Sequence, residues 1–305
     1  MNLLVAIVGP TAAGKSQMAI RLAQQFDGEI VSADSRQVYR FMDIGTAKPS
    51  QQELSLVPHQ LVDIKNPDED FSLAQYQQIA YQSIDDIQQR HKLPLLVGGS
   101  GLYVRAVLEG WKIPEVAPDL ELRKKFEEKA DRGETDELYR ELMETDPAAA
   151  RRIDPRNVRR LIRALEVSRY TGAPVSQLQN KQAPPFDILI IGLTAERKEL
   201  YRRIDQRVDK MIEQGLVEEV KKLVDMGFGM DLPAMSGIGY KQIGAFLKGE
   251  MTLESAIGQI KTETHRFVRR QYNWFRLTDD RIKWFDITTD FKAEITGLVS
   301  RFISK

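Results

Sequence analysis

The sequence contains no cysteine and only three histidines, His59, His91 and His265. The absence of cysteine excludes a disulfide framework, a thiolate zinc site, an iron–sulfur cluster and a cysteine nucleophile together. Three histidines leave little material for an imidazole-based metal site. Cysteine-based sites are therefore excluded, and a histidine-based metal site is disfavoured.

The chain has no excess of positive or negative charge, and it does not begin with a long hydrophobic run. Its 44 basic side chains are balanced by 44 acidic ones, and 42% hydrophobic with 29% charged residues is typical of a globular protein. The apolar start lacks the basic segment of a signal peptide and reaches Gly9 far too early to span a membrane. We therefore expect the protein to be a cytoplasmic monomer that has no membrane partner.

Two local concentrations of positive charge break this balance. Residues 151–169 hold seven arginines against only two acids, and residues 261–276 interleave basic with aromatic side chains. Nucleic-acid binding needs a local electropositive face and does not need a net positive charge on the whole protein, so a balanced net charge does not exclude it. Solvated helix faces produce the same pattern. Composition leaves both interpretations open.

Short buried strands alternate with amphipathic helices in most of the chain. A helix is predicted over 16–26, and Ser72 with Gln75 forms the capping box of another. Amphipathic helices are also predicted around 200–212 and 291–302. This alternation predicts an α/β fold with a mainly parallel sheet flanked by helices. The expected strands are 3–8, 29–32, 93–97, 188–193 and 284–287.

The alternation is interrupted in the middle of the chain. Charged residues occupy 17 of the 28 positions in 119–146, with apolar residues at helical spacing between them. The arginine-rich stretch continues this region, and Ala183-Pro184-Pro185 closes it like a linker. We therefore predict an inserted all-helical domain at 115–185 in a core formed by 1–114 and 186–305.

A phosphate-binding motif lies between the first predicted strand and the first predicted helix. Backbone N–H groups of such a loop cradle phosphate oxygens, Lys15 neutralises them, and the Ser16 hydroxyl ligates Mg²⁺. The motif predicts a P-loop NTPase-like core that binds a diphosphate or nucleotide. It comprises Gly9, Pro10, Thr11, Ala12, Ala13, Gly14, Lys15 and Ser16.

A second acid for NTP hydrolysis is missing from the expected places. The strand 93–97 ends in Gly98-Gly99, and the strand 188–193 ends in Thr194, where a hydrolysing NTPase presents an aspartate. Asp34, at the end of the short second strand, is the only well-placed acid. It lies where open α/β sheets bind ligands, but a turn-forming or capping role is an equal alternative.

Several further motifs follow along the chain: 34–39, 42–49, Pro58-His59, 98–103, Arg270-Gln271 and 274–276. Together they resemble the motifs of the tRNA dimethylallyltransferase family. Their order and spacing agree over nearly the whole chain, and the segment 160–167 resembles the family's insertion domain. Two departures are visible: Ser100 stands where threonine is commoner, and Gln60 follows His59 where a second histidine is expected.

The resemblance implies an activity, a cofactor and partners. Such enzymes transfer dimethylallyl from its diphosphate to N6 of the adenine just 3′ of the anticodon in tRNA, with magnesium as cofactor. The carboxylate of Asp34 then acts as general base, because an adenine amino group is a poor nucleophile. Lys15 and Ser100 complete the catalytic set, and Ser16 holds Mg²⁺. We expect His59 to be an ordinary loop histidine.

The resemblance also implies which residues contact the tRNA anticodon stem-loop. The target base is extruded from the stack, and a basic groove with aromatic and arginine side chains suits that. The implied contacts are Asp34, Ser35, Arg36, Gln37, Ser100, Arg123, Arg159, Arg160, Leu161, Ile162, Arg163, Arg270, Gln271, Trp274 and Arg276.

Two alternatives explain part of the sequence. A P-loop kinase, or an adenylate isopentenyltransferase that uses a free nucleotide, explains the phosphate loop but leaves the arginine clusters and the insertion without a purpose. A non-catalytic RNA-binding protein whose loop senses a nucleotide explains the clusters but predicts no turnover. Supplying a labelled prenyl donor with either RNA or a free nucleotide distinguishes all three.

Overall fold

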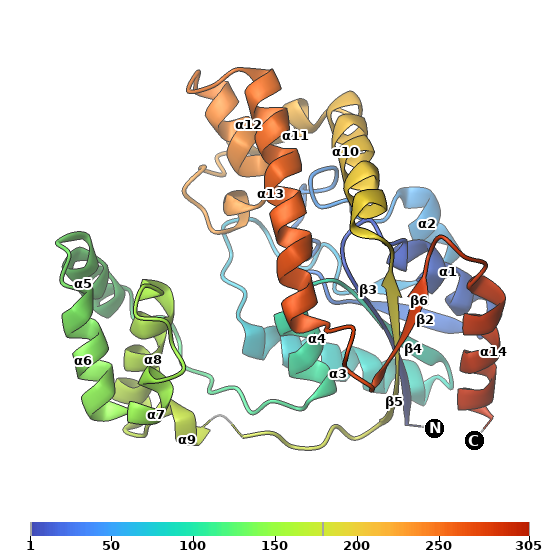
Figure 1. Ribbon diagram of the computed structural model, residues 1–305, viewed down its shortest axis with the longest axis horizontal. Coiled ribbons are helices and arrows are strands. Elements are labelled where there is room, and N and C mark those ends of the chain that lie inside the picture. The colour runs from blue at the N-terminus through green and yellow to red at the C-terminus, as the bar shows by residue number, and fades with distance from the viewer. Residues whose placement is uncertain (1, 179, 305) are drawn as a thin grey trace. The chain divides into compact units, whose positions relative to one another are not determined.

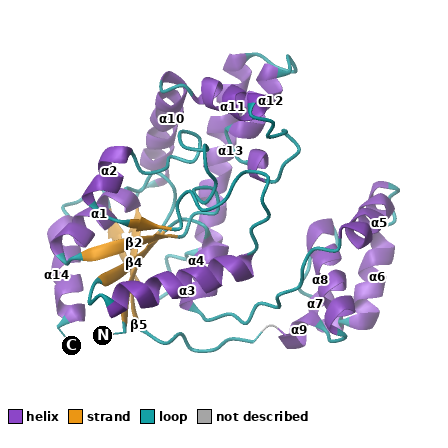
Figure 2. Cartoon of the chain, turned by 180° about the vertical axis from the view of Figure 1, so that it is seen from behind, coloured by secondary structure: helices purple, strands orange, loops and turns teal. Residues whose placement is uncertain are grey.

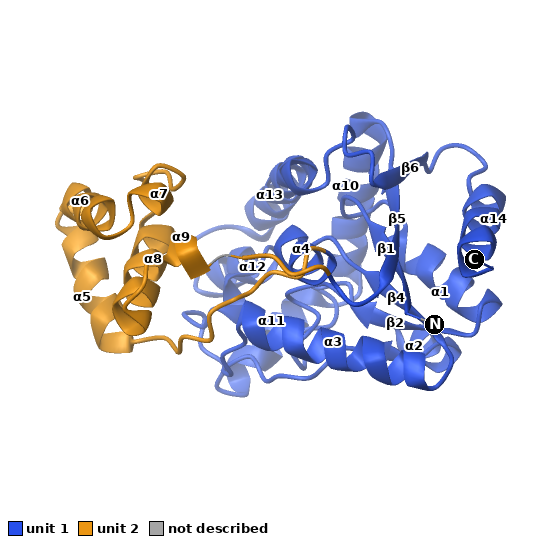
Figure 3. Ribbon diagram, turned by 90° about the horizontal axis from the view of Figure 1, so that it is seen from below, with its two compact units in different colours: residues 1–108, 184–305 blue, residues 109–183 orange. Residues whose placement is uncertain are grey.

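A computed structural model describes residues 2–178 and 180–304, which form two compact units (Figure 3). The core unit comprises residues 1–108 and 184–305, and the helical unit comprises residues 109–183. Every strand of the described chain lies in the core unit, whereas the helical unit contains helices and their connections (Figure 2).

The core unit is built on one six-stranded sheet, in which every neighbouring pair is parallel (Figure 1). Its spatial order is β3-β2-β4-β1-β5-β6. The predicted α/β class with a mainly parallel sheet is confirmed. The strands are β1 (Leu3–Val8), β2 (Gly28–Ser32), β3 (His59–Gln60), β4 (Leu93–Val97), β5 (Asp187–Thr194) and β6 (Ile282–Asp286).

The central strands are buried on both faces, which is why their sequences are continuously apolar. Val5 and Ile7 of β1 pack on the face that carries α1 (Lys15–Gln25) and α14 (Lys292–Ile303). Leu4 and Ala6 pack on the face that carries α3 (Leu73–Gln89) and α4 (Gly101–Leu108). The predicted capping box starts α3: Ser72 Oγ accepts from the Gln75 amide at 3.2 Å, and Gln75 Oε1 accepts from the Ser72 amide at 2.9 Å.

Several elements of the core unit were not predicted from the sequence. They are α2 (Gln51–Leu56), the two-residue edge strand β3, α4, α11 (Leu216–Asp225), the 3-10 turn η1 (Ala234–Ser236) and α12 (Tyr240–Leu247). The basic and aromatic stretch 261–276 lies largely in α13 (Leu253–Trp274), and the helix predicted around 200–212 is α10 (Arg197–Glu213). Among the described residues, no helix combines the length and the apolar character needed to cross a membrane.

The helical unit has a hydrophobic core of its own. Phe126, Leu138, Leu142, Leu161 and Leu165 are each at most 1% exposed and pack together. The unit begins earlier than the predicted residue 115, because its two connecting segments pair: Trp111 bridges Lys181, and the Lys112 amide donates to Asn180 O at 2.8 Å. Its helices are α5 (Leu120–Asp131), α6 (Thr135–Thr145), α7 (Pro147–Ala150), α8 (Val158–Thr171) and α9 (Val175–Leu178).

Candidate active site

A cavity of about 780 Å³ lies in the core unit beside the segments that follow β1, β2 and β4. Parallel strands bring their carboxyl ends to one edge of the sheet, which is where open α/β sheets bind ligands. Residues of the phosphate loop, the segment after β2 and the glycine pair after β4 line this cavity together. The structure therefore brings Lys15, Ser16, Asp34, Gln37 and Gln271 to one space.

The phosphate loop has the backbone that its glycines permit. Gly9 has φ 132°, and a Cβ at this position would lie 2.2 Å from the Leu193 carbonyl oxygen, so only glycine fits against β5. Ala12 and Gly14 also have positive φ, and the Gly14 conformation starts α1. Lys15 Nζ donates to Pro10 O at 2.8 Å, which closes the loop over its own lysine. The Ser16 side chain is exposed to the cavity.

The cavity is electropositive at its phosphate end. Burial and, to a smaller extent, the Arg207 charge lower the pKa of Lys15 to about 8, although the Asp34 carboxylate opposes both. Arg203, Arg207 and Lys210 of α10 also line the cavity. These three residues were not predicted from the sequence, because they belong to no phosphate motif. Their only sequence signal is a run of basic side chains along a helix whose apolar face is Leu200, Ile204 and Val208.

The lowered pKa of Lys15 predicts a pH dependence of anion binding. A diphosphate beside the ammonium group favours its charged form, so binding above pH 8 requires uptake of a proton. Affinity for inorganic diphosphate should therefore fall about tenfold between pH 7 and pH 9. Isothermal titration calorimetry in buffers of different ionisation enthalpy measures both the affinity and the proton uptake. A Lys15→Met variant should show weak affinity without this slope, and a slope that persists in it would assign the effect to another group.

Asp34 combines a local turn with an available carboxylate oxygen. Its Oδ1 accepts from the Arg36 amide at 2.9 Å, which is the turn-forming role that sequence patterns allow. No described group hydrogen-bonds to its Oδ2. The carboxylate also interacts electrostatically with Lys15 and Arg207. Turn formation and proton acceptance are thus compatible in one side chain, because they use different oxygens.

Ser100 connects the loop after β4 to the segment that carries Asp34. Its Oγ accepts from the Ser35 amide at 3.1 Å and lies 3.3 Å from Ser35 Oγ. Arg36 instead reaches η1, where its guanidinium donates to Pro233 O at 2.8 Å and to Ala234 O at 3.0 Å. The structure therefore places Ser100 next to the candidate base and assigns Arg36 bonds within the protein.

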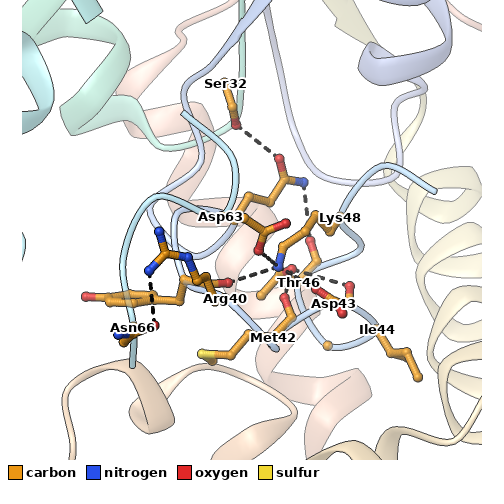
Figure 4. A network of polar contacts seen from close by, with 12 residues as sticks. Ser32, Arg40, Met42, Asp43, Ile44, Thr46, Lys48, Asp63 and Asn66 are labelled. Carbon is orange, nitrogen blue, oxygen red and sulfur yellow. Dashed lines mark hydrogen bonds and ion pairs between the residues drawn. The ribbon is translucent and has the colours of Figure 1, made fainter. Parts of the chain in front are cut away.

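The loop 42–48 forms another wall of the cavity and is held from two sides. Figure 4 shows the polar contacts around Lys48 on one of these sides. Lys48 Nζ, whose side chain is 3% exposed, donates to Asp43, to Asp63 Oδ1 at 2.6 Å and to Tyr39 O at 2.9 Å. Gln37 accepts from Ser32 Oγ at 3.0 Å and donates to Ala47 O at 3.2 Å. The predicted RNA contact Gln37 is therefore already tied to this loop.

The carboxylate of Glu219 on α11 holds the same loop from the other side. It accepts the backbone N–H groups of Asp43, Ile44 and Gly45 at 2.9, 2.7 and 3.1 Å, and the Tyr240 hydroxyl at 2.6 Å. Three consecutive amides on one carboxylate form a strong local anchor. Glu219 was not predicted from the sequence, since no neighbouring residue or motif distinguishes it from the other acidic residues of α11.

His59 lies in β3 and lines the cavity, so its prediction as a loop histidine is corrected. Its Nδ1 lies 2.8 Å from Val57 O and is the donor, because a carbonyl oxygen only accepts. Burial lowers the pKa of His59 below its ordinary value, although the bond to Val57 opposes this shift. The imidazole is therefore neutral at neutral pH. Gln60, beside it, donates to Glu29 Oε2 at 3.2 Å.

The predicted RNA contacts in the helical unit separate into three groups. Arg159 and Arg160 are exposed, whereas Leu161 and Ile162 are 0% and 3% exposed, so the side chains of these two pack in the core of the helical unit. Arg123 and Arg163 both bind the buried carboxylate of Glu166. Burial raises the pKa of Glu166, but these bonds and the Asp119 amide outweigh it and hold the pKa below its ordinary value.

The end of α13 likewise divides into outer and inner side chains. Arg270 and Arg276 are exposed, while Trp274 packs against Gly101, with the Arg105 guanidinium 5.9 Å from its ring centroid. Gln271 is 3% exposed and hydrogen-bonds to Thr11 and Gly99. Among the described residues, no three His, Asp or Glu side chains are grouped as a metal site.

Comparison with known proteins agrees with this geometry. The family model of IPP transferases matches residues 37–278. A tRNA dimethylallyltransferase of Dehalococcoides mccartyi is 48% identical over 99% of this chain and 93% of its own, and that of Roseiflexus castenholzii is 54% identical over 90% and 89%.

Solved structures agree as well. A tRNA isopentenylpyrophosphate transferase from Bacillus halodurans is 43% identical with a TM-score of 0.73, over 98% of this chain and 96% of its own. A eukaryotic dimethylallyltransferase acting on tRNA has a TM-score of 0.83 at 29% identity, over 99% of this chain and 78% of its own. With a parallel sheet, a phosphate loop and a family match that spans most of its length, the chain belongs to the IPP transferase family.

Proposed function

We propose that this protein is a tRNA dimethylallyltransferase that moves the prenyl group from dimethylallyl diphosphate to N6 of the adenine 3′-adjacent to the anticodon. The observation that carries this proposal is a single cavity lined by both a phosphate loop and the Asp34 carboxylate. A diphosphate and a proton-losing nucleophile are the two groups that such a cavity suits. The names of its relatives mention tRNA and a transferred dimethylallyl group, which supports this choice of substrates.

The proposed reaction uses the residues of this cavity in defined roles. The adenine N6 attacks C1 of the dimethylallyl group, and a C–N bond forms as the C–O bond to the diphosphate breaks. The bonding electron pair leaves on the diphosphate oxygen, where loop amides, Lys15 and Arg207 stabilise the growing negative charge. The N6 proton passes to the Asp34 carboxylate. Ser100 holds the segment that carries Asp34 through its bond to the Ser35 amide.

A divalent metal fits the donor groups present. Mg²⁺ keeps several waters and binds substrate phosphates with few protein ligands, so the absence of a preformed acidic cluster in the described chain suits a substrate-bound ion. The exposed Ser16 hydroxyl in the cavity is the side chain that would hold it. Bound there, the ion would supply positive charge to the leaving diphosphate.

The RNA partner is proposed to be the anticodon stem-loop of tRNA. Exposed arginines on both units supply positive charge, and these are Arg159 and Arg160 on α8 and Arg270 and Arg276 at the end of α13. The protein is further proposed to act as a monomer. A phosphate that reached Arg123 or Arg163 would have to compete with the buried Glu166, so we assign these two a supporting role.

The affinity for tRNA should fall steeply with salt, because each phosphate neutralised by an arginine releases counterions. For single strands the slope of log affinity against log salt is about 0.7 per contact. Arg160→Gln should flatten the slope by about that amount, and diphosphate binding should keep its own slope. Filter binding over a salt series measures this. Arg202→Gln, an equal charge loss at an exposed ion pair on α10, is the control. A salt-independent affinity would identify the clusters as ordinary solvated faces.

The direct test of the proposed function is transfer of label from dimethylallyl diphosphate. The purified protein is supplied with the labelled donor and either tRNA or adenosine monophosphate, and the nucleosides are then identified by mass spectrometry. We expect label on N6 of a single adenine of tRNA and none on the free nucleotide. Label on the nucleotide alone would establish the small-molecule alternative, and no turnover with either acceptor would establish the non-catalytic one.

A further inference from the structure

One buried side-chain amide connects two loops of the candidate site. Gln271 comes from the last turn of α13 and is 3% exposed, although glutamine is mostly a surface residue. Burying an amide is costly unless its hydrogen bonds are made. Here both ends are used: the Thr11 amide donates to Oε1 at 2.9 Å, and Nε2 donates to Gly99 O at 3.0 Å.

The orientation of this amide follows from its partners. A backbone N–H can only donate and a carbonyl oxygen can only accept, so Oε1 must face Thr11 and Nε2 must face Gly99. A Cβ on residue 99 would lie 2.3 Å from Nε2, so the glycine is what allows this close approach. Neither an ionised glutamate nor a hydrophobic residue can satisfy both partners.

The two bonded loops carry different parts of the proposed chemistry. Thr11 belongs to the phosphate loop, whose amides and Lys15 bind the donor in our proposal. Gly99 precedes Ser100, and Ser100 bonds to the Ser35 amide beside Asp34. A continuous chain of hydrogen bonds thus runs from the phosphate loop through Gln271 to the segment that carries the base.

We propose that Gln271 is a positioning residue that sets the phosphate loop relative to the loop after β4. It acts through Thr11 and Gly99 and makes no direct contact with RNA, which separates it from the exposed Arg270 beside it. The expected effect of Gln271 on turnover rests on the proposed function. Its effect on anion binding can be measured without tRNA.

Gln271→Glu is the most informative variant, since it keeps the shape and the acceptor for Thr11. Its second oxygen then faces the Gly99 carbonyl, and two acceptors repel unless the carboxyl group is protonated. At pH 8 we expect binding of inorganic diphosphate with Mg²⁺ to weaken about 10-fold and the single-turnover rate to fall by about 10- to 100-fold. Affinity for tRNA should stay within about twofold of the wild type.

The same variant should recover as the pH falls. Burial raises the pKa of a carboxyl group, and the protonated form can donate to Gly99 O as the amide does. The ratio of variant to wild-type rate should therefore rise several-fold between roughly pH 8 and pH 6. Taking the ratio largely removes the titration of Lys15, which both proteins contain. Gln271→Leu loses both bonds and should be slow at every pH.

Gln259→Glu is the matched control, because it makes the same substitution at an exposed position of the same helix. It should leave diphosphate affinity and the pH profile unchanged. Weaker tRNA affinity with normal diphosphate binding in Gln271→Glu would overturn the proposal and identify a direct RNA contact. A pH-independent loss in Gln271→Glu would also overturn it, since general unfolding predicts no recovery. Wild-type protein that binds diphosphate but transfers nothing to tRNA would instead overturn the proposed function.

Discussion

Replacing Asp34 by asparagine should slow prenyl transfer to tRNA by about two to four orders of magnitude, with little change in substrate binding. Asparagine keeps an Oδ1 that can accept from the Arg36 amide, so the local turn survives. Only the ability to take a proton is lost. Loss confined to the single-turnover rate marks an interaction made in the transition state.

The pH of this assay has to be chosen with Lys15 in mind. The Asp34 carboxylate raises the pKa of Lys15, which is about 8 in the wild type, so its removal lowers that pKa further. Measurements from about pH 6 to pH 7 keep the wild-type lysine charged, and a ratio of variant to wild-type rate that stays constant over this range separates the two effects. Asp27→Asn, before the start of β2 and paired with Lys92, is a control for the substitution itself. A near-normal rate in Asp34→Asn would show that water or another group accepts the proton.

Lys15→Ala should lower donor affinity and rate together, reducing kcat/KM for dimethylallyl diphosphate by about three orders of magnitude. The ammonium interacts with the bound diphosphate and still more strongly with the departing one, because negative charge grows on it during the reaction. Calorimetry with inorganic diphosphate measures the part of the loss in kcat/KM that comes from weaker binding in the ground state. Single-turnover kinetics at saturating donor gives the remainder.

Lys221→Ala removes the same charge from an exposed position on α11 and controls for the change in net charge. It should bind diphosphate normally. A Lys15→Ala variant with weak binding but a normal rate at saturation would restrict the lysine to ground-state binding, and the stabilisation of the leaving group would then belong to the loop amides and Arg207.

The local parts of the fold could be predicted because short-range patterns encode them. A strand buried on both faces needs an apolar run, a phosphate loop needs glycines at fixed offsets, and a capping box needs Ser72 three residues before Gln75. The two-residue strand β3 was missed, since two residues carry no periodicity. The helices after β5 were also missed in part because their contacts, and not their local pattern, distinguish them.

What the sequence by itself determined about this protein is therefore its fold class, its phosphate loop and the position of Asp34 after a strand, all of which depend on neighbours in the chain. Only the tertiary structure decided which polar side chains share a site. Gln271 meets Thr11 across 260 positions, Glu219 meets Gly45 across 174, and Glu166 meets Arg123 across 43. Burial of Leu161 and Ile162, against exposure of Arg159 and Arg160, likewise follows from the core that α8 packs against. A side chain's partners follow from packing, and packing is a property of the whole folded chain.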